Sequence, residues 1–463
     1  AQTETIWSML HKTDAFPDKA FKEAWKNVIL FSEHTWGASA SGTDPHSKFT
    51  KDLWEGKKAY ADNASNQSQI LYKQALSPLH VDKGGDFVHV LNTNLWNRTD
   101  VVFLDSMVNL NEKELITRTG EKVETQRLYD GRWAFVAENI PALSSEVYQI
   151  VSKKKSSRRF VSMIAENKIL NNGIVRVEID EVKGTISSFK RVGDSYEYAS
   201  NSGLNDYLYT GRYASDPQGI EQILNIRVLD DGAVAATLRI ESKAPGCNTL
   251  WRDVTVYKGI DRVDICNTLD KQDILDFENV RFVFPFNIQQ PEITMDLAMS
   301  EIHPEREQLE GVNKHYYSLQ NGLAVGDLEH AVCLTTVDAP FVELGSPSGL
   351  DYRLNPRHGY GWWQSAKISP IVYSWVMTNT WRTNYKASQG GTAKFRYSLQ
   401  PCNPLDLKLK QRGAEREMEL VAVASRSSQN IEQLFRLKGR HRIALSSIKP
   451  ADDGKGYIVC LHN

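Results

Sequence analysis

The pattern of hydrophobic positions changes its period near residue 80 of the 463-residue chain. Before that point, apolar side chains recur every three or four residues, as they do on one face of an α-helix. Phe21, Trp25 and Val28 follow this spacing directly after Pro17 and Asp18, two residues that favour a helix start. The pattern therefore predicts a helix from about residue 17 to residue 32.

A second helix is predicted from about residue 46 to residue 76, after a loop rich in small residues at 37–45. The side chains expected to point inward are Phe49, Leu53, Tyr60, Ala64 and Leu71. Two helices with a polar connection indicate part of a bundle, and the weak stretch 4–12 is the available third helix. We therefore predict a partial helical bundle over residues 1–80.

After Ser77-Pro78 the period becomes two, which is typical of β-strands. Short alternating segments between Asn, Gly and Pro turns lie at 87–93, 99–105, 132–138 and 146–152. They predict a small β-sandwich over residues 81–155. The basic run 153–159 is interpreted as a solvated linker that ends this unit.

Strand signals continue with almost no helical pattern from residue 160 to residue 401, for example at 173–180 and 280–288. So long a run of antiparallel patterning predicts one large two-sheet sandwich over residues 156–403. A terminal β unit is predicted for residues 404–463. The fold class is therefore mainly β with an N-terminal α-helical segment.

Composition and charge narrow the range of functions. The chain has 55 basic and 57 acidic residues, a net charge of -2, and no basic stripe, so a nucleic-acid partner is not expected. No apolar run reaches the roughly 18 residues that a membrane helix needs, so no membrane partner is expected either. The five cysteines lack the paired spacing of a zinc site.

His34 is the first candidate for chemistry, because it ends the predicted first helix in the sequence FSEHTWGA. One interpretation is a histidine that caps the helix or packs at its end, where the imidazole meets the last carbonyl groups. The other is a metal ligand or an acid–base group, and a metal would need about three further ligands. The residues alone leave both open. The H-x-D spacing at His80-Val81-Asp82 is interpreted as chance.

The segment 358–391 is rich in tryptophan, tyrosine and amide side chains. Aromatic faces beside polar groups match a sugar ring, which has apolar CH faces and hydroxyl edges. A core strand pair with an aromatic rim would show the same composition. Within this segment, the candidate sugar-binding residues are Trp381, Asn384 and Tyr385. No pair of acids stands out in the sequence as a glycosidase acid and nucleophile.

Several motifs, in order along the chain, resemble glycoside hydrolase family 38, the retaining α-mannosidases. The resemblance is to the C-terminal half of a bacterial, Bacteroides-type member. It rests on AWKNVILFSEHTWGASASGTDP (24–45), LNTNLWNRTDVV (91–102), ILNNGIVRVEIDEVKGTISSF (169–189), GLNDYLY (203–209), WRTNYKASQGGTAKFRYSL (381–399) and IKPADDGKGYIVCLHN (448–463).

The resemblance implies a galactose-mutarotase-like supersandwich for the large β unit. It also implies a zinc cofactor for which His34 is the last ligand, although Thr35 stands where many members have Asp. The other ligands and the catalytic carboxylates would belong to an N-terminal catalytic domain, so no catalytic residue is expected among these 463 residues. The implied partners are that domain and a mannose-containing oligosaccharide, and the implied location is periplasmic or secreted.

Three hypotheses follow. The first is the C-terminal region of such an α-mannosidase, inactive when isolated. The second is a non-catalytic carbohydrate-binding or scaffold module that uses the aromatic segment. The third is a mutarotase-like enzyme that would use a His and a Glu, for which the sequence shows no obvious pair.

Overall fold

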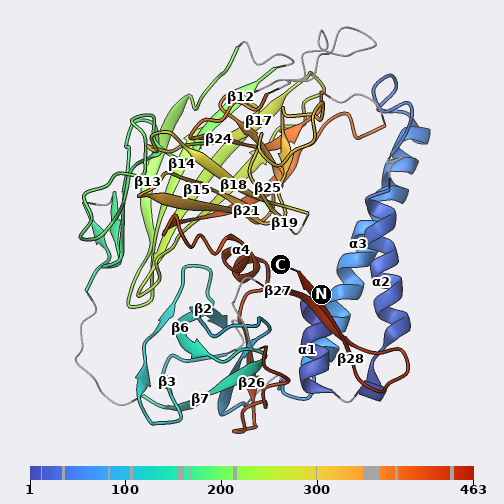
Figure 1. Ribbon diagram of the computed structural model, residues 1–463, viewed down its shortest axis with the longest axis vertical. Coiled ribbons are helices and arrows are strands. Elements are labelled where there is room, and N and C mark those ends of the chain that lie inside the picture. The colour runs from blue at the N-terminus through green and yellow to red at the C-terminus, as the bar shows by residue number, and fades with distance from the viewer. Residues whose placement is uncertain are drawn as a thin grey trace.

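The computed structural model describes the chain except for residues 12, 34–36, 82–83, 105–107, 154–160, 167, 212–215, 299, 348–364, 381–383, 438–442 and 463. It is mainly β with a helical segment at the N-terminus, as predicted. The large sandwich lies at the top of Figure 1, the small sandwich lies below it, and the helices stand at one side. No helix in the described residues is long and apolar enough to cross a membrane.

The N-terminal helices are α1 (Gln2–Leu10), α2 (Asp18–Phe31) and α3 (Lys48–Leu76), with a short 3-10 turn at Thr13–Ala15. Helices α2 and α3 form a long hairpin, and α1 packs at its base, so the third helix of the predicted bundle is present. At this base an apolar cluster that includes Trp7, Phe21 and Leu71 also contacts Leu91 and Val423 of the small sandwich. The base of the hairpin is therefore held by hydrophobic burial.

The prediction that Phe49 and Leu53 point inward is wrong, since their exposed fractions are 62% and 40%. The reason is the unequal length of the two helices. Lys57 of α3 donates a hydrogen bond of 2.7 Å to the carbonyl of Leu30, near the last residue of α2. The turns of α3 before Lys57 therefore extend past the end of α2, and no second helix in the described part of the chain covers their apolar side chains.

The small sandwich consists of two antiparallel sheets. The first has the order β26 (Val421–Ser425), β1 (Phe87–Asn92), β7 (Ser144–Ser152), β3 (Lys113–Ile116), β4 (Lys122–Val123). The second has the order β2 (Arg98–Leu104), β6 (Trp133–Ile140), β5 (Thr125–Arg127). Their facing side chains, among them Val90, Val102 and Phe135, form one buried core.

The large sandwich contains a nine-stranded sheet, a five-stranded sheet and a four-stranded sheet. The nine-stranded order is β13 (Gln222–Asp231), β14 (Ala235–Lys243), β15 (Cys247–Tyr257), β16 (Val263–Lys271), β25 (Gly391–Cys402), β22 (Ala331–Thr336), β21 (Gly322–Gly326), β18 (Glu292–Leu297), β19 (Ser300–Ile302). The five-stranded order is β12 (Asp206–Thr210), β17 (Asn279–Pro285), β24 (Ile371–Thr378), β23 (Phe341–Leu344), β20 (Tyr317–Ser318). The four-stranded order is β11 (Ile186–Arg191), β10 (Val175–Ile179), β9 (Ile169–Asn171), β8 (Ile164–Ala165).

Side chains along β17 alternate between the core of the large sandwich and the outer face of the five-stranded sheet. Phe282 and Phe284 lie in the core shared by the sheets, where they contact Tyr397 of β25. Arg281, directly before Phe282, has its side chain on the opposite face of the five-stranded sheet. The period-two pattern that predicted the strand therefore separates a hydrophobic face from a face that can carry polar groups.

The segment 404–463 does not form the separate terminal β unit that we predicted. It begins with helix α4 (Leu409–Glu417), which contacts β22 of the large sandwich. Strand β26 then pairs with β1, with Phe87 opposite Ser425, and so completes the first sheet of the small sandwich. The hairpin β27 (Ala444–Pro450) and β28 (Tyr457–His462) packs on α1. The elements of this segment thus contact all three parts of the fold, and Leu409, Leu445 and Ile448 are buried in apolar clusters shared with other elements. The other domain limits stay predictions.

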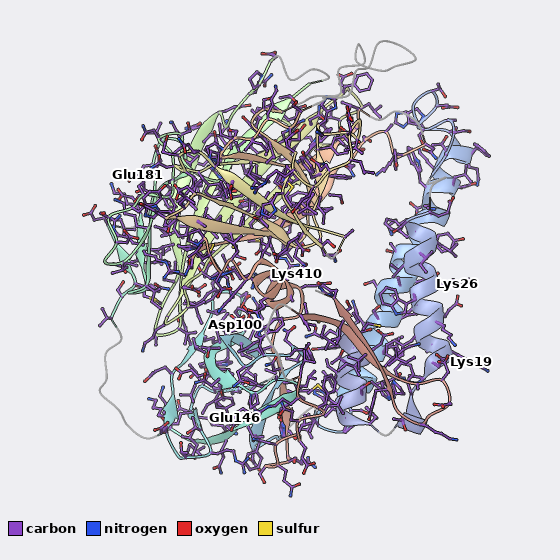
Figure 2. All side chains as sticks on the ribbon, in the orientation of Figure 1. Lys19, Lys26, Asp100, Glu146, Glu181 and Lys410 are labelled. Atoms are coloured by element: carbon purple, nitrogen blue, oxygen red, sulfur yellow. The ribbon has the colours of Figure 1, made fainter. Side chains whose placement is uncertain are left out.

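A buried ionic network joins the two sandwiches. Asp100 of β2, labelled near the junction in Figure 2, contacts Arg98 at 2.9 Å and Arg262 of the large sandwich at 2.9 Å. Arg98 also donates to the carbonyl of Met418, just after α4. Burial acts to raise the pKa of Asp100, but the charges of Arg262 and Arg98 outweigh it, so the pKa is lowered. The carboxylate is therefore ionised at neutral pH and holds two buried cations.

Candidate functional site

The predicted site residues fall on two segments that are far apart in the sequence. His34 and Trp381 lie outside the described residues. Asn384 and Tyr385 are described and lie in the loop between β24 and β25. The structure therefore places two of the four predicted residues, and it describes the chain that follows His34 from Gly37 onward.

The side chain of Asn379 anchors the loop between β24 and β25 through hydrogen bonds. The side-chain amide of this residue donates to the carbonyls of Asp276 at 2.8 Å and Ala387 at 3.2 Å. Its side-chain oxygen accepts a bond of 2.7 Å from the amide of Glu278. Because one buried amide side chain connects both ends of the loop to the turn before β17, the position of Asn384 is fixed relative to the five-stranded sheet.

The tip of the helical hairpin contacts this loop directly. The backbone carbonyl of Asn384 accepts hydrogen bonds from the amide of Ala38 at 3.1 Å and from the Ser41 hydroxyl at 3.3 Å. The indole of Trp54, on α3, donates to the Ser41 oxygen at 3.0 Å. We call this set of contacts the tip joint. It connects α3 to the sugar-binding loop predicted from the sequence.

Gly37 allows the two backbones to meet at the tip joint. Its φ of +82° lies in the left-handed region, and a Cβ atom at this position would lie 1.9 Å from the Asn384 carbonyl oxygen. Any other residue would be strained there and would push the loop away. Gly37 directly follows the segment 34–36, and Asn384 directly follows the segment 381–383.

Aromatic side chains surround the loop on the outer face of the five-stranded sheet. Tyr385 is 51% exposed. Tyr316 makes edge contacts with Phe341 at 5.7 Å and with Trp375 at 6.1 Å between ring centroids. Burial raises the pKa of Tyr316, and the neighbouring Tyr385 adds to the effect. Trp375 and Tyr385 belong to the aromatic segment 358–391, whereas Tyr316 and Phe341 precede it. Together these rings give the loop an apolar surface.

A fully buried ion pair supports the aromatic face. Arg281 donates to Glu343, and neither side chain is exposed. The Arg281 guanidinium lies 4.6 Å from the Trp375 ring centroid, at cation–π distance. Sequence analysis did not identify this pair, because Arg281 and Glu343 are 62 residues apart and each occurs within an ordinary strand pattern.

Glu278, whose backbone amide is bonded to Asn379, has a buried carboxylate. It contacts Lys271 at 2.7 Å and accepts a hydrogen bond of 3.0 Å from the Tyr209 hydroxyl. Burial raises the pKa of Glu278, although the hydrogen bond and charge of Lys271 act in the opposite direction. Both carboxylate oxygens are thus engaged, and Glu278 acts as a structural partner of Lys271 and not as an open proton donor.

The described residues do not assemble a metal site by themselves, since no three His, Cys, Asp or Glu side chains among them converge. Glu33, next to His34 in the sequence, has its carboxylate 3.4 Å from the Lys57 ammonium. A metal bound near the tip joint would therefore need ligands from outside these residues.

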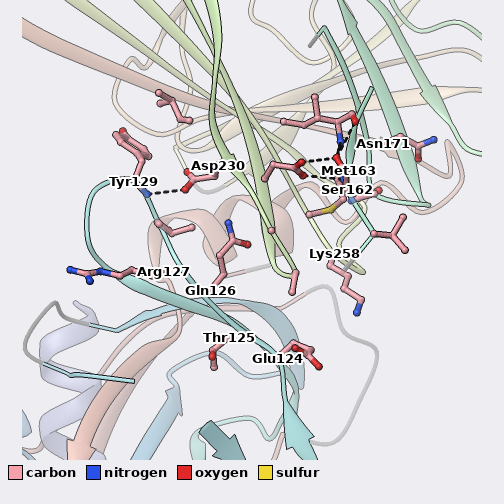
Figure 3. Close-up of a pocket in the computed structure, with 18 of the residues that line it drawn as sticks. Glu124, Thr125, Gln126, Arg127, Tyr129, Ser162, Met163, Asn171, Asp230 and Lys258 are labelled. Atoms are coloured by element: carbon pink, nitrogen blue, oxygen red, sulfur yellow. Dashed lines mark hydrogen bonds between the residues drawn. The ribbon is translucent and has the colours of Figure 1, made fainter. Parts of the chain in front are cut away.

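A separate groove of about 1220 Å³ lies between the two sandwiches (Figure 3). Asp230 accepts a hydrogen bond from the amide of Tyr129 at 2.8 Å. Asp231 accepts bonds from the Ser162 hydroxyl at 2.6 Å and the Met163 amide at 3.2 Å. Burial raises the pKa of Asp230. Asp230 thus accepts a bond across the junction, and Asp231 accepts bonds within the large sandwich, so both carboxylates are engaged in holding the walls of the groove.

The fold has counterparts among solved structures. An alpha-mannosidase from Enterococcus faecalis V583 aligns with 99% of this chain and 59% of its own length, at 12% identity and a TM-score of 0.71. A protein in glycosyl hydrolase family 38 from Enterococcus faecalis aligns with 99% of this chain and 62% of its own length, at 12% identity and a TM-score of 0.72. The chain thus spans about three fifths of the length of these two structures and has the fold of the part that it spans.

A galactose mutarotase-like protein from Lactobacillus casei aligns with 53% of this chain and 100% of its own length, at 12% identity and a TM-score of 0.30. No protein-family model and no curated protein matches the sequence.

Proposed function

We propose that this chain is the C-terminal region of a retaining, zinc-dependent α-mannosidase that acts on mannose-containing glycans, of the bacterial, Bacteroides-type branch of family 38. The fold of two family 38 and α-mannosidase structures over 99% of the chain supports this proposal. The ordered sequence motifs support it independently, because they were identified without the structure.

The tip joint is the observation that carries the proposal. It brings Gly37 and Ala38, which follow His34 in the sequence, against Asn384, which follows Trp381. A zinc ligand and a sugar-binding loop serve one reaction only if they face the same substrate. Two segments 343 residues apart in the sequence meet at this place.

His34 is proposed as one ligand of the zinc. The described residues offer no complete ligand set, so the remaining ligands are assigned to an N-terminal catalytic domain. When bound, the zinc would act as a Lewis acid that holds sugar hydroxyl groups. The chain itself would contribute the position of His34, through the connection of the hairpin tip to the large sandwich.

Trp381, Asn384 and Tyr385 are proposed to form one wall of the mannoside pocket. The half-exposed ring of Tyr385 offers an apolar face to a sugar ring. The backbone carbonyl of Asn384 holds the loop against Ala38 and Ser41, and the side-chain amide is proposed to bind sugar hydroxyls. The carboxylate nucleophile and the acid that retention requires are assigned to the catalytic domain.

The outer face of the hairpin supports the presence of that partner. Trp25 and Ile29 lie one turn apart on α2 with exposed fractions of 45% and 66%, and Phe49 of α3 is 62% exposed. Large exposed apolar side chains on the two helices of the hairpin support a surface that another protein unit covers. The proposed occupant is the N-terminal catalytic domain of the same protein.

An assay with an aryl α-mannoside tests the proposal. The 463-residue chain with added zinc should show no turnover, and the full-length protein should hydrolyse the α-anomer with retained configuration. Robust turnover by the chain alone, or a full-length protein that is inactive on α-mannosides, would overturn it. The proposed periplasmic or secreted location is checked by fractionating the source cells.

A non-catalytic carbohydrate-binding or scaffold module is the second candidate, favoured by the exposed rings of Tyr385 and Phe341 beside Tyr316. Calorimetry of the chain with mannose oligosaccharides distinguishes it from the first. Measurable affinity that Tyr385→Ala removes, together with an inactive full-length protein, would favour the binding module.

A further inference from the structure

Two cysteines of the large sandwich have their sulfur atoms next to each other. Cys333 lies on β22 and Cys402 ends β25, and these strands pair with Ala331 opposite Cys402 and Cys333 opposite Gln400. The two cysteines are therefore diagonal neighbours on the same face of the sheet. Their sulfur atoms are 3.3 Å apart, and the side chains are 0% and 6% exposed, respectively.

The surroundings make the two thiols chemically different. Cys333 lies in a small apolar cluster, and its sulfur is within 3.6 Å of the Leu407 carbonyl oxygen, an alternative acceptor for its one S–H proton. The hydrogen bond from Cys333 lowers the pKa of Cys402, and the guanidinium groups of Arg412 and Arg191 lower it further. A slightly accessible thiol with a lowered pKa is the one that reacts first, and a buried neighbour can then resolve it.

We propose that Cys333 and Cys402 form a reversible disulfide bond that joins β22 to β25. A disulfide needs a sulfur–sulfur distance of about 2.05 Å, so the two atoms must approach by roughly 1.3 Å, which small side-chain rotations supply between neighbouring strands. The oxidant is a low-molecular-weight disulfide such as glutathione disulfide. The proposal does not depend on the proposed mannosidase function.

The reaction balances as two thiol–disulfide exchanges. The Cys402 thiolate attacks one sulfur of glutathione disulfide, and the expelled glutathione thiolate takes up the proton that Cys402 released. The Cys333 thiol then loses its proton and attacks the Cys402 sulfur of the mixed disulfide, which expels the second glutathione as a thiol. One S–S bond and two protein S–H bonds are consumed, and one protein S–S bond and two glutathione S–H bonds are formed.

The bond would close a loop of 69 residues that contains Asn379, Asn384 and Tyr385. A cross-link over so long a loop restricts the unfolded chain and stabilises the fold. The pair would therefore act as a strengthening cross-link for the large sandwich in an oxidising compartment, where such bonds persist.

The test is oxidation of the folded chain with glutathione disulfide at about pH 8, followed by alkylation in denaturant and peptide mass mapping. We expect two of the five thiols to be lost, a cross-linked peptide pair that contains Cys333 and Cys402, and full recovery with dithiothreitol. The melting temperature should rise by about 2–5 °C on oxidation.

Cys333→Ser should leave Cys402 as a mixed disulfide with glutathione and abolish the rise in melting temperature. Cys266→Ser is the matched control, because the sulfur of this free cysteine lies 3.9 Å from the Thr268 hydroxyl, and it should behave as the unaltered protein. Five thiols that persist after oxidation, or cross-links only through the exposed Cys460, would overturn the proposal. Because the mapping of the unaltered chain alone decides this, a variant that fails to fold leaves the test intact.

Discussion

The large sandwich is attached to its neighbours by two joints of opposite character. Its joint with the small sandwich is a buried ionic network, in which Asp100 holds Arg98 and Arg262 at 2.9 Å each. Its joint with the helical hairpin is made of uncharged hydrogen bonds, in which the Asn384 carbonyl accepts from the Ala38 amide and the Ser41 hydroxyl. The first joint uses charges that must be paired. The second uses a backbone carbonyl with one backbone donor and one hydroxyl donor, and depends on Gly37 for space.

We expect the ionic joint to contribute mainly to the stability of the fold, and the tip joint mainly to the position of the loop that contains Asn384. A buried charge network is strongly destabilised when one member is removed, because the remaining charges cannot be solvated. A joint of a few backbone bonds contributes little free energy of unfolding, but it fixes the distance between the hairpin tip and the loop that contains Asn384. We therefore expect substitutions at the two joints to change different measured quantities.

The largest effect is predicted for Asp100→Ala. It leaves Arg98 and Arg262 buried without their shared carboxylate, so the free energy of unfolding should fall by about 3–5 kcal/mol. Urea unfolding followed by fluorescence measures this. A loss below about 1 kcal/mol would show that the network does not hold the sandwiches together.

The lowered pKa of Asp100 also predicts that the stability of the folded chain depends on pH. The pKa of Asp100 is lower in the folded chain than its usual 3.8, so the ionised carboxylate contributes stability that is complete above that value. This contribution is lost as the pH falls from about 4 through the lowered pKa. The stability difference between the unaltered chain and Asp100→Asn, measured by urea unfolding, should therefore shrink between pH 7 and pH 2. A difference that is constant or grows toward acid would contradict this assignment.

A smaller effect on stability, but a larger one on positioning, is predicted for Gly37→Ala. Its matched control is Gly193→Ala, where φ is +86° and no atom lies within 4 Å of the added methyl group. Both variants should lose about 1–2 kcal/mol from left-handed backbone strain. Only Gly37→Ala should also open the tip joint, so hydrogen exchange at the Ala38 amide should rise about tenfold or more. Equal exchange in the two variants would mean that the tip joint does not depend on the glycine.

The smallest effect is predicted for a surface ion pair that belongs to neither joint. Lys48 and Asp52 of α3 are 2.5 Å apart, but their side chains are 87% and 61% exposed. Because solvent screens such a pair, Lys48→Ala should leave the urea midpoint unchanged within error. A clear loss would indicate that the overhanging end of α3 is more tightly held than its exposure suggests.

Periodicity in the sequence predicted the helices and the mainly β fold because each of these elements has one buried face. It failed where burial depends on a distant partner. Phe49 and Leu53 fit a helical stripe, yet α2 ends before it can cover them. The pairing of β26 with β1 depends on a segment hundreds of residues away, and the position of α4 depends on β22, which precedes it by several strands and loops.

The residues of the two joints are also hard to predict from the sequence, for different reasons. Asp100 and Arg262 are 162 residues apart, and no local pattern distinguishes them from surface charges. The tip joint is even harder to predict from the sequence, because its acceptor is a backbone carbonyl, which every residue has. Only Gly37 has a detectable sign, a glycine directly after FSEHTW, and it indicated a turn and not a contact.

Turnover of an aryl α-mannoside in the presence of zinc tests the central claim most directly, when it is measured for the 463-residue chain alone and for the full-length protein. The account predicts no turnover by the chain alone, and turnover by the full-length protein that His34→Ala abolishes and Gly37→Ala reduces relative to Gly193→Ala. Turnover by the chain alone, or a full-length enzyme indifferent to His34→Ala, would contradict it.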